Sequence, residues 1–417
     1  MESATVRNRI VRVFLALTST LAALALIMSR APVRAQAPAA LAVTALATPA
    51  GASSSEPNFT VQDNRVILSW LEGNEEHATL KFAERTATGW TPAQTVHGGD
   101  TMYVNAADIP SVRILGNDSL AAYWPEQNGP DPEASTLRLA LSSNQGKTWS
   151  APVSPYKDAS KTEHGFVSLF QTPGAGTGLS VVWLDGRAQA TNEDGDMALR
   201  SATFDAAGKQ LRETVVDPRV CECCSTSSAT TPEGVIVAYR DRSPGEIRDI
   251  YVTTFNGTAW SAPVRVHADN WKIDGCPVNG PSISARGREV AVAWFTARND
   301  QGQAYVAFSH DAGHTFGQAV RVDDAKTLGH VSVQLLPDNS AAVSWMEMTN
   351  SMAELHTRRV TPAGVRSPAV NVAPKGYPDS RSPKMIGNDK ELLFAWTESD
   401  DKGVDKVQVA RAVLPGN

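Results

Sequence analysis

The sequence predicts an all-β protein built as a seven-bladed β-propeller, and three observations carry this prediction. A short apolar run ends in an aromatic residue, its cap, seven times along the chain: at Trp70, Trp124, Trp183, Tyr239, Trp294, Trp345 and Trp396. The gaps between caps are 54, 59, 56, 55, 51 and 51 residues, too long for a helical hairpin repeat and right for a four-stranded blade. Helical periodicity is absent throughout, so seven repeats predict seven blades.

The first 35 residues are predicted to be a targeting segment rather than part of the fold. Three arginines precede an apolar core over residues 13–28, and Val33 and Ala35 place small residues where a signal peptidase reads. The core is short of the roughly 20 residues that a membrane-spanning helix needs. We therefore predict a signal peptide over residues 1–35 and export to the periplasm or the exterior, with an uncleaved anchor as the alternative.

The expected mature chain is acidic. The full sequence has a formal net charge of −6, and removal of residues 1–35 takes away five arginines and one glutamate, which leaves −10. This charge disfavours nucleic acid and anionic membrane surfaces as partners, and no membrane span is expected after cleavage. Residues 36–55 are assigned to a linker with a possible ring-closing strand. Residues 56–417 are assigned to one propeller, because repeat units pack only on their neighbours.

Each repeat contains four predicted strands in a fixed order. The innermost strand comes first, as in the segments that begin at Pro110 and Pro281, and the aromatic-capped strand follows it. A third strand, such as that from Gln303, leads to an outermost strand where proline is tolerated, because an edge need not donate every N–H. The last repeat ends too soon for an outermost strand. Residues 41–48 are predicted to supply it and to close the ring between the two termini.

One turn carries a family motif. Residues Ser309–Phe316 match the pattern S-x-D-x-G-x-T-[WF], and residues 142–149 repeat it with Asn144 in place of the aspartate. The segment resembles the Asp-box, or BNR repeat, of the sialidase-like β-propeller superfamily, of which the chain is interpreted as a non-sialidase member. In that family the box is a turn between the third and fourth strands. The resemblance thus implies a structural role for Asp311 as an acceptor of turn hydrogen bonds.

The resemblance also implies an alternative activity, the sialidase-type hydrolysis of acidic sugars by a glycoside hydrolase similar to the exo-α-sialidases. Sialidases of this superfamily bind the substrate carboxylate with three arginines and use a tyrosine nucleophile. The residues that could fill these roles are Tyr377, Arg381, Arg187, Arg242 and Arg298. The sequence departs from the family at residues 58–62, where the first inner strand lacks the family's first arginine. Sialidases of the family typically have six blades, so a six-bladed ring is the alternative fold.

A carboxylate stands two residues after the cap in six of the seven repeats, and the fifth repeat has Thr296 at that position. One interpretation is that each acid stabilises its turn by accepting backbone hydrogen bonds. The other is that acids and arginines form a ring around the channel mouth and bind a small polar or charged ligand. Both interpretations can hold together.

All four cysteines fall on this same face, in adjacent repeats. Cys221, Cys223 and Cys224 precede the inner strand of the fourth repeat, and Cys276 occupies the corresponding connection one repeat later. Disulfides are the default in an exported chain, but a bond from Cys223 to Cys224 or to Cys221 would close a very small ring and strain its geometry, so at most one of the three pairs comfortably with Cys276. Three interpretations remain: a copper or zinc site, a disulfide with a redox-active remainder, and inert thiols.

His330 and His164 directly precede inner strands on the same face and are the candidates to complete a metal site. The favoured function is an exported cell-envelope propeller whose cysteine-lined channel mouth binds a soft metal ion, copper or zinc, or acts as a redox or binding module. The expected partners are the metal ion or a small polar ligand, and a protein on the channel-mouth face. Whether the chain is an enzyme is left open, with the sialidase-type glycosidase as the alternative.

Overall fold

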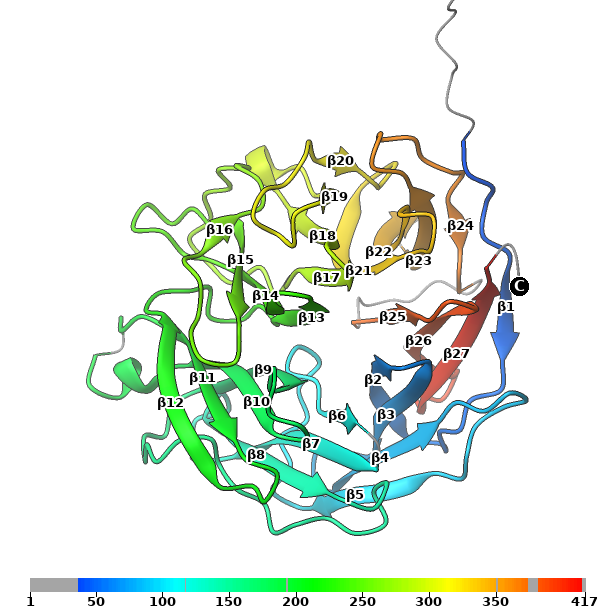
Figure 1. Cartoon of the computed structure of the whole chain (residues 1–417). Helices are drawn as coiled ribbons and strands as arrows, with labels where there is room; N and C mark the ends of the chain where they lie inside the picture. The colour runs from blue at the N-terminus through cyan, green and yellow to red at the C-terminus, as the bar shows by residue number, and fades with distance from the viewer. Residues whose placement is uncertain (1–36, 117, 193, 350–351, 374–381, 415–417) are drawn as a thin grey trace, which may run out of the picture. The chain divides into compact units, whose positions relative to one another are not determined.

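The computed structural model describes residues 37–116, 118–192, 194–349, 352–373 and 382–414. Residues 38–417 form one compact unit, and the predicted signal peptide lies outside the described residues. The compact unit holds seven antiparallel sheets arranged around a central channel (Figure 1). The prediction of a seven-bladed propeller is confirmed, and the six-bladed alternative is wrong.

Within each blade, the strands are ordered from the channel outward. The first three blades contain β2 (Ser54–Gln62), β3 (Arg65–Gly73), β4 (Ala78–Glu84) and β5 (Gln94–Gly99); β6 (Ser111–Gly116), β7 (Ser119–Gln127) and β8 (Ser135–Ser142); and β9 (His164–Gln171), β10 (Leu179–Asp185), β11 (Ala198–Phe204) and β12 (Gln210–Asp217). The fourth and fifth contain β13 (Ser227–Thr231), β14 (Gly234–Arg240), β15 (Ile250–Phe255) and β16 (Val264–Arg265); and β17 (Ser282–Arg286), β18 (Glu289–Thr296), β19 (Gln303–Ser309) and β20 (Val320–Arg321). The last two contain β21 (Thr327–Leu335), β22 (Ala341–Thr349), β23 (Met352–Val360) and β24 (Val370–Asn371); and β25 (Lys384–Gly387), β26 (Glu391–Ser399), β27 (Asp405–Val413) and β1 (Val43–Leu46). Two short 3-10 helices, η1 (Arg187–Ala190) and η2 (Arg298–Asp300), follow β10 and β18.

Four of the seven outermost strands are very short or reduced to a bridge, whereas β5 has six residues and β12 has eight. β16, β20 and β24 have two residues each, and the second blade has only a single bridge between Leu139 and Val153 at this position. Pro152 and Pro155 lie close to Val153 in the sequence, and each proline removes an N–H that a longer ladder would need. The prolines that identify these segments as edges therefore also limit their pairing.

The outermost strand of the seventh sheet comes from the N-terminal part of the compact unit. β1 pairs antiparallel with β27, with Val43 opposite Ala412 and Leu46 opposite Val409, and the two strands lie side by side in Figure 1. Leu41, just before β1, is buried in the hydrophobic cluster of the seventh blade. β1, which lies within the residues 41–48 predicted for this position, thus pairs with the outer edge of β27 over Val43–Leu46.

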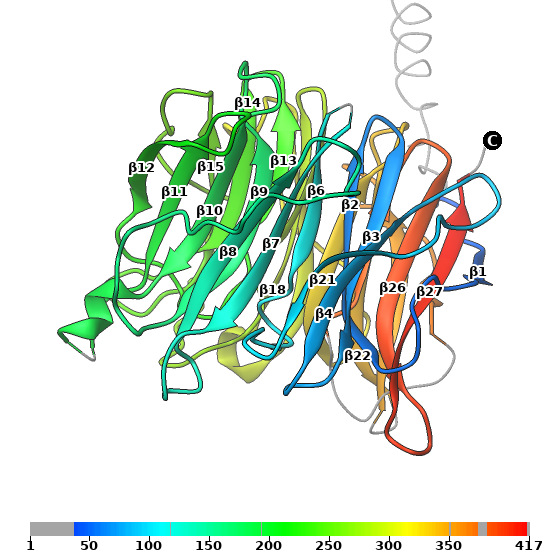
Figure 2. The ribbon, with the colours of Figure 1, turned by 90° about the horizontal axis from the view of Figure 1, so that it is seen from below.

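Neighbouring blades lie face to face around the ring, as the side view shows (Figure 2). The tryptophan caps are buried between them. In four repeats the indole N–H donates to the carboxylate two residues on: Trp70 to Glu72 (2.9 Å), Trp124 to Glu126 (3.1 Å), Trp183 to Asp185 (2.7 Å) and Trp345 to Glu347 (2.8 Å). Residues two apart on a strand point to the same face, so each acid satisfies a buried donor. In these four repeats the repeated acid therefore serves the tryptophan, and Glu72 and Asp185 each also accept a backbone N–H, from Gly51 and Arg187.

Serine side chains join the inner strands of neighbouring blades around the channel. The backbone N–H groups of Ile283, Val333 and Met385 donate to the hydroxyls of Ser227 (3.2 Å), Ser282 (3.0 Å) and Ser332 (3.2 Å), respectively. The channel side of an inner strand has no strand partner, so its N–H groups need other acceptors. These serines provide them and link β13, β17, β21 and β25 in sequence.

The turn that carries the motif is held by its own side chains. Asp311 accepts hydrogen bonds from the Ser309 hydroxyl (2.7 Å), the Thr315 N–H (2.9 Å) and the Thr315 hydroxyl (2.6 Å). Asn144 accepts the equivalent bond from the Thr148 N–H at 3.0 Å. Desolvation opposes ionisation of Asp311, but the bonds from Thr315 and Ser309 outweigh it and lower the pKa of this carboxyl to about 2. Asp311 therefore belongs to the scaffold.

Candidate functional site

A cavity of about 560 Å³ occupies the central channel and is lined by the inner strands of all seven blades. Amide and hydroxyl side chains make up much of its lining, with Arg113 and Lys384 as cations. Burial lowers the pKa of both cations. Cys223 and His330 also line the cavity, so the cysteine segment borders the channel through Cys223.

The cysteine segment connects the third blade to the fourth, between β12 and β13. The Cys221 N–H donates to the Arg240 carbonyl at 3.0 Å, which holds the segment against the end of β14. Cys223 and Cys276 form a disulfide, with their Cα atoms 5.9 Å apart. One of the three clustered cysteines thus pairs with Cys276. This bond withdraws two sulfurs from the predicted set of four metal ligands, because a metal binds the free thiolate.

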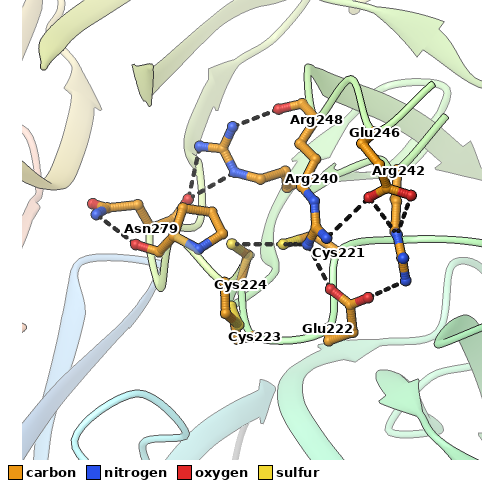
Figure 3. The surroundings of a disulfide bond; sticks show 11 residues. Cys221, Glu222, Cys223, Cys224, Arg240, Arg242, Glu246, Arg248 and Asn279 are labelled. Carbon is orange, nitrogen blue, oxygen red and sulfur yellow. Dashed lines mark hydrogen bonds and ion pairs between the residues drawn. A yellow bond between two sulfur atoms is a disulfide. The ribbon is translucent and has the colours of Figure 1, made fainter. Parts of the chain in front are cut away.

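Cys221 and Cys224 are free thiols, only 1% and 2% exposed, and their Sγ atoms lie 3.2 Å apart (Figure 3). The Arg248 guanidinium donates to Cys221 Sγ at 3.3 Å. The hydrogen bond from the Cys224 thiol, followed by the positive charge of Arg240, lowers the pKa of Cys221 to about 6 against opposing desolvation. Burial raises the pKa of Cys224. Cys221 is therefore favoured as the thiolate, and Cys224 as the thiol that donates to it.

Arg240 supplies a buried positive charge beside these sulfurs. Its side chain is 2% exposed, and its guanidinium donates to the carbonyl oxygens of Asn279 (2.8 and 3.1 Å), Arg248 (2.6 Å) and Phe295 (2.8 Å). In the described part of the chain, no carboxylate forms an ion pair with it. A buried cation is costly without a counter-charge, and the thiolate form of Cys221 provides one.

Ion pairs fasten the cysteine segment to the connection between β14 and β15. Glu222 pairs with Arg242 and Arg248, and Glu246 pairs with the same two arginines at 2.9 and 3.2 Å (Figure 3). Arg248 thus contacts two carboxylates as well as Cys221 Sγ. The network fixes the guanidinium that stabilises the Cys221 thiolate.

Neither predicted histidine joins the sulfurs. His330 Nδ1 lies 3.2 Å from the Ser382 hydroxyl, and desolvation with the charge of Lys384 lowers the pKa of His330 to about 4. His164 is buried in the third blade, with its ring stacked 4.5 Å from that of Tyr156. Among the described residues, one group is close enough to hold a metal ion: Cys221, Cys223 and Cys224, whose sulfurs lie within 4.8 Å of one another.

Of the residues predicted for a sialidase-type site, two arginines are held in ion pairs. Arg187 pairs with Asp185 at 2.6 Å and with Glu213 at 3.1 Å, and Arg242 is held in the network of Glu222 and Glu246. Arg298 is exposed in η2. Tyr377 and Arg381 lie outside the described residues. The glycosidase alternative stays a prediction.

Arg248 donates to Cys221 Sγ and, together with the hydrogen bond from Cys224, the charge of Arg240 lowers the pKa of Cys221, roles that the sequence did not predict. One signal in the sequence pointed to Arg240, which directly follows the cap Tyr239. The six other caps are followed by uncharged residues, namely Leu71, Pro125, Leu184, Phe295, Met346 and Thr397. A charged residue at a position that is uncharged in the six other repeats indicates that this repeat needs a charge there. The neighbouring cysteine segment explains why.

No protein-family model and no curated protein matches the chain. Among solved structures, the polysaccharide lyase Uly1 is similar over 92% of this chain and 94% of its own, at 11% identity and a TM-score of 0.51. The NanB sialidase from Streptococcus pneumoniae is similar over 84% of this chain and 83% of its own, at 9% identity and a TM-score of 0.48. A protein of unknown function from Dyadobacter fermentans is similar over 89% of this chain and 98% of its own, at 14% identity and a TM-score of 0.47. At such identities the similarity concerns the fold alone.

In the part of the chain that the structure describes, no helix is long and apolar enough to cross a membrane.

Proposed function

We propose that this chain is an exported β-propeller, periplasmic or secreted, whose Cys221–Cys224 pair beside the channel is a redox-active dithiol. The observation that carries the proposal is the placement of two buried sulfurs 3.2 Å apart beside the Arg240 guanidinium, which lacks a carboxylate partner among the described residues. The thiolate is the nucleophile in disulfide exchange, and nearby cations increase the thiolate fraction. Such a pair can oxidise to a disulfide and be reduced again.

A redox titration tests this proposal. The purified chain is equilibrated in glutathione buffers of graded ratio, quenched with acid, alkylated and digested, and mass spectrometry measures the fraction of the Cys221–Cys224 disulfide. We expect one reversible transition in the wild type and none in Cys221→Ser or Cys224→Ser. Ser225→Ala, next to the pair, is the control and should titrate as the wild type does. A pair that stays reduced throughout, or that cannot be reduced again once oxidised, contradicts the proposal.

The spacing of the sulfurs favours a soft metal ion as a second candidate ligand. Reduction of the Cys223–Cys276 disulfide would present three thiolates, those of Cys221, Cys223 and Cys224, within 4.8 Å of one another. Cu(I) prefers thiolate ligands, and its single charge suits a site beside the guanidinium groups of Arg240 and Arg248 better than the double charge of Zn(II) does. Metal analysis of protein purified anaerobically under reductant, compared with Cys223→Ser, tests this candidate. Copper that is lost in the variant supports it, and a metal-free wild type contradicts it.

Export has its own test, the N-terminus of the chain recovered from its native cells. Cleavage after Ala35 gives a mature chain that begins at Gln36. Recovery of the chain from the periplasm or the medium with this N-terminus supports export. A chain that begins at Met1 in the cytoplasm contradicts it.

A further inference from the structure

We propose that the four cysteines form a thiol–disulfide relay, in which the Cys223–Cys276 disulfide exchanges with the Cys221–Cys224 pair and Cys276 meets a protein partner. This inference rests on the proposed function, because it needs Cys221 and Cys224 to cycle between dithiol and disulfide. It adds the path of the electrons and the class of partner, a protein that presents a dithiol or a disulfide.

The first support is the proximity of the reduced and oxidised pairs. The Sγ atoms of Cys221, Cys223 and Cys224 lie within 4.8 Å of one another, and Cys223 is bonded to Cys276. Disulfide exchange begins when a thiolate attacks one sulfur of a disulfide. The exchange then requires a movement of the cysteine segment that brings Cys221 Sγ onto Cys223 Sγ, from a distance of no more than 4.8 Å.

The second support is the order of burial. Cys276 is exposed, Cys223 is half-buried at the channel, and Cys221 and Cys224 are buried. A protein partner can therefore reach the outer disulfide but not the inner pair. Val278, two residues from Cys276, is 41% exposed and offers the partner an apolar contact beside the outer disulfide.

The exchange conserves atoms, electrons and charge. The Cys221 thiolate attacks Cys223 Sγ, the S–S bond to Cys276 breaks, and its electron pair leaves on Cys276 Sγ. Cys224 then loses its proton and attacks Cys221 Sγ, and Cys223 leaves and takes up that proton. The inner pair has lost two electrons and become a disulfide. The outer pair has gained them and is now a thiolate and a thiol.

The partner completes the cycle through Cys276. The Cys276 thiolate attacks a disulfide of the partner, and Cys223 resolves the mixed disulfide, so that the partner leaves as a dithiol and the outer disulfide is restored. A partner dithiol drives the same steps in reverse. It reduces the outer disulfide, which in turn reduces the inner one. The state seen in the structure, with the outer pair oxidised and the inner pair reduced, is the end point of that reverse direction.

Trapping the intermediate tests the internal exchange. Cys224→Ser removes the sulfur that completes the second step, so incubation with iodoacetamide should alkylate Cys276 and leave a Cys221–Cys223 disulfide. Cys221→Ser removes the attacking sulfur, and its Cys223–Cys276 disulfide should stay intact under the same treatment. Acid quenching and peptide mapping by mass spectrometry read both results. An intact Cys223–Cys276 disulfide in Cys224→Ser overturns the relay.

Exchange with a protein probe tests the role of the outer disulfide. Chains with both pairs oxidised are mixed with reduced thioredoxin, and formation of inner thiols is followed over time. The double variant Cys223→Ala/Cys276→Ala should be reduced at least about tenfold more slowly than the wild type, because the buried pair has lost its route to the surface. Dithiothreitol, a small dithiol, is the control probe, and its rates of reduction of the wild type and the double variant should differ less. Equal rates with thioredoxin overturn the relay.

The two proposals fail in distinguishable ways. If the inner pair cycles in glutathione buffers while Cys224→Ser keeps its outer disulfide, the relay is wrong and the redox function stands. If the inner pair never cycles, both proposals fall. Thermal unfolding of each variant checks its fold. Should the double variant not fold, the trapping experiment decides, because Cys224→Ser starts with the Cys223–Cys276 disulfide in place.

Discussion

The indole N–H of Trp294 donates to the carboxylate of Asp269 at 2.6 Å. In four other repeats the acceptor lies two residues after the tryptophan, but the fifth repeat has Thr296 there. Asp269 comes instead from the connection between β16 and β17. The acid that is missing from the strand is thus supplied by a loop, which indicates that the buried indole is the group that needs it.

Removing this acceptor should destabilise the fold. We expect Asp269→Ala to lower the free energy of unfolding by about 1–3 kcal/mol, because a buried indole N–H loses its acceptor. Adding Thr296→Glu returns an acid to the position that the other repeats use and should recover part of the loss. Denaturant unfolding measures both, with Asp274→Ala, an exposed acid in the same connection, as the control. An equal loss for both aspartates contradicts the assignment.

Cys221 should ionise at a lower pH than an ordinary thiol, because of the groups around it. Its pKa of about 6 lies below the ordinary thiol value of about 8.5, so the thiolate stabilises the folded chain above that ordinary value. This contribution is lost as the pH falls through about 6. The ultraviolet absorbance of the thiolate, followed with pH, measures the transition. Arg248→Gln should move it upward, whereas Arg288→Gln, at an exposed arginine, should not. A transition at the ordinary value in the wild type would count against the proposed environment.

Two substitutions at Asp311 should separate the contribution of its hydrogen bonds to the stability of the motif turn from that of its charge. Asp311→Asn keeps an acceptor, as Asn144 does in the second blade, but loses the ionic contribution, so it should lower the melting temperature less than Asp311→Ala does. Asp311→Ala loses three hydrogen bonds and should cost about 1–3 kcal/mol. Because the pKa of Asp311 is lowered to about 2, its ionic contribution is present above the ordinary aspartate value and is lost as the pH falls through about 2. A melting temperature of Asp311→Ala equal to that of the wild type would show that the turn does not need the side chain.

Closure of the ring by the N-terminal segment should contribute to stability. Deletion of residues 36–50 removes β1, the buried Leu41 and the cover of β27, so we expect a lower melting temperature and a greater tendency to aggregate through the exposed edge. Deletion of residues 36–38 alone is the control and should have little effect. Thermal unfolding and light scattering measure the two consequences. An unchanged melting temperature after the longer deletion would contradict a stabilising closure.

The sequence was sufficient to predict the blades but not the bonds inside the cysteine segment. Seven caps at regular spacing define seven sheets, because each cap marks a strand that must be buried between neighbours. The positions of the caps do not predict which sulfur lies next to Cys276. That depends on the paths of two connections, β12 to β13 and β16 to β17. The choice of Cys223, with Cys221 and Cys224 left reduced, needed coordinates.

The histidines show the same limit. A position before an inner strand predicts the face on which His164 and His330 lie, but seven such positions are spread around a ring. Knowing the face of the propeller on which a histidine lies therefore does not predict its distance from the sulfurs. Arg240 is the opposite case, because its place after the cap was visible in the sequence, while its contacts with the carbonyl groups of Asn279 and Phe295 arise only when blades four and five pack together.

The pairing of β1 with β27 also bears on the order of folding. Val43 and Ala412 are opposite each other although 369 residues separate them in the sequence, so their contact closes a loop of nearly the whole compact unit. Contacts of such long range carry the largest closure entropy and form late. Until they form, the first strand of one molecule can pair with the last strand of another. Pairing of β1 with β27 of a second molecule would give a domain-swapped dimer in place of the closed monomer.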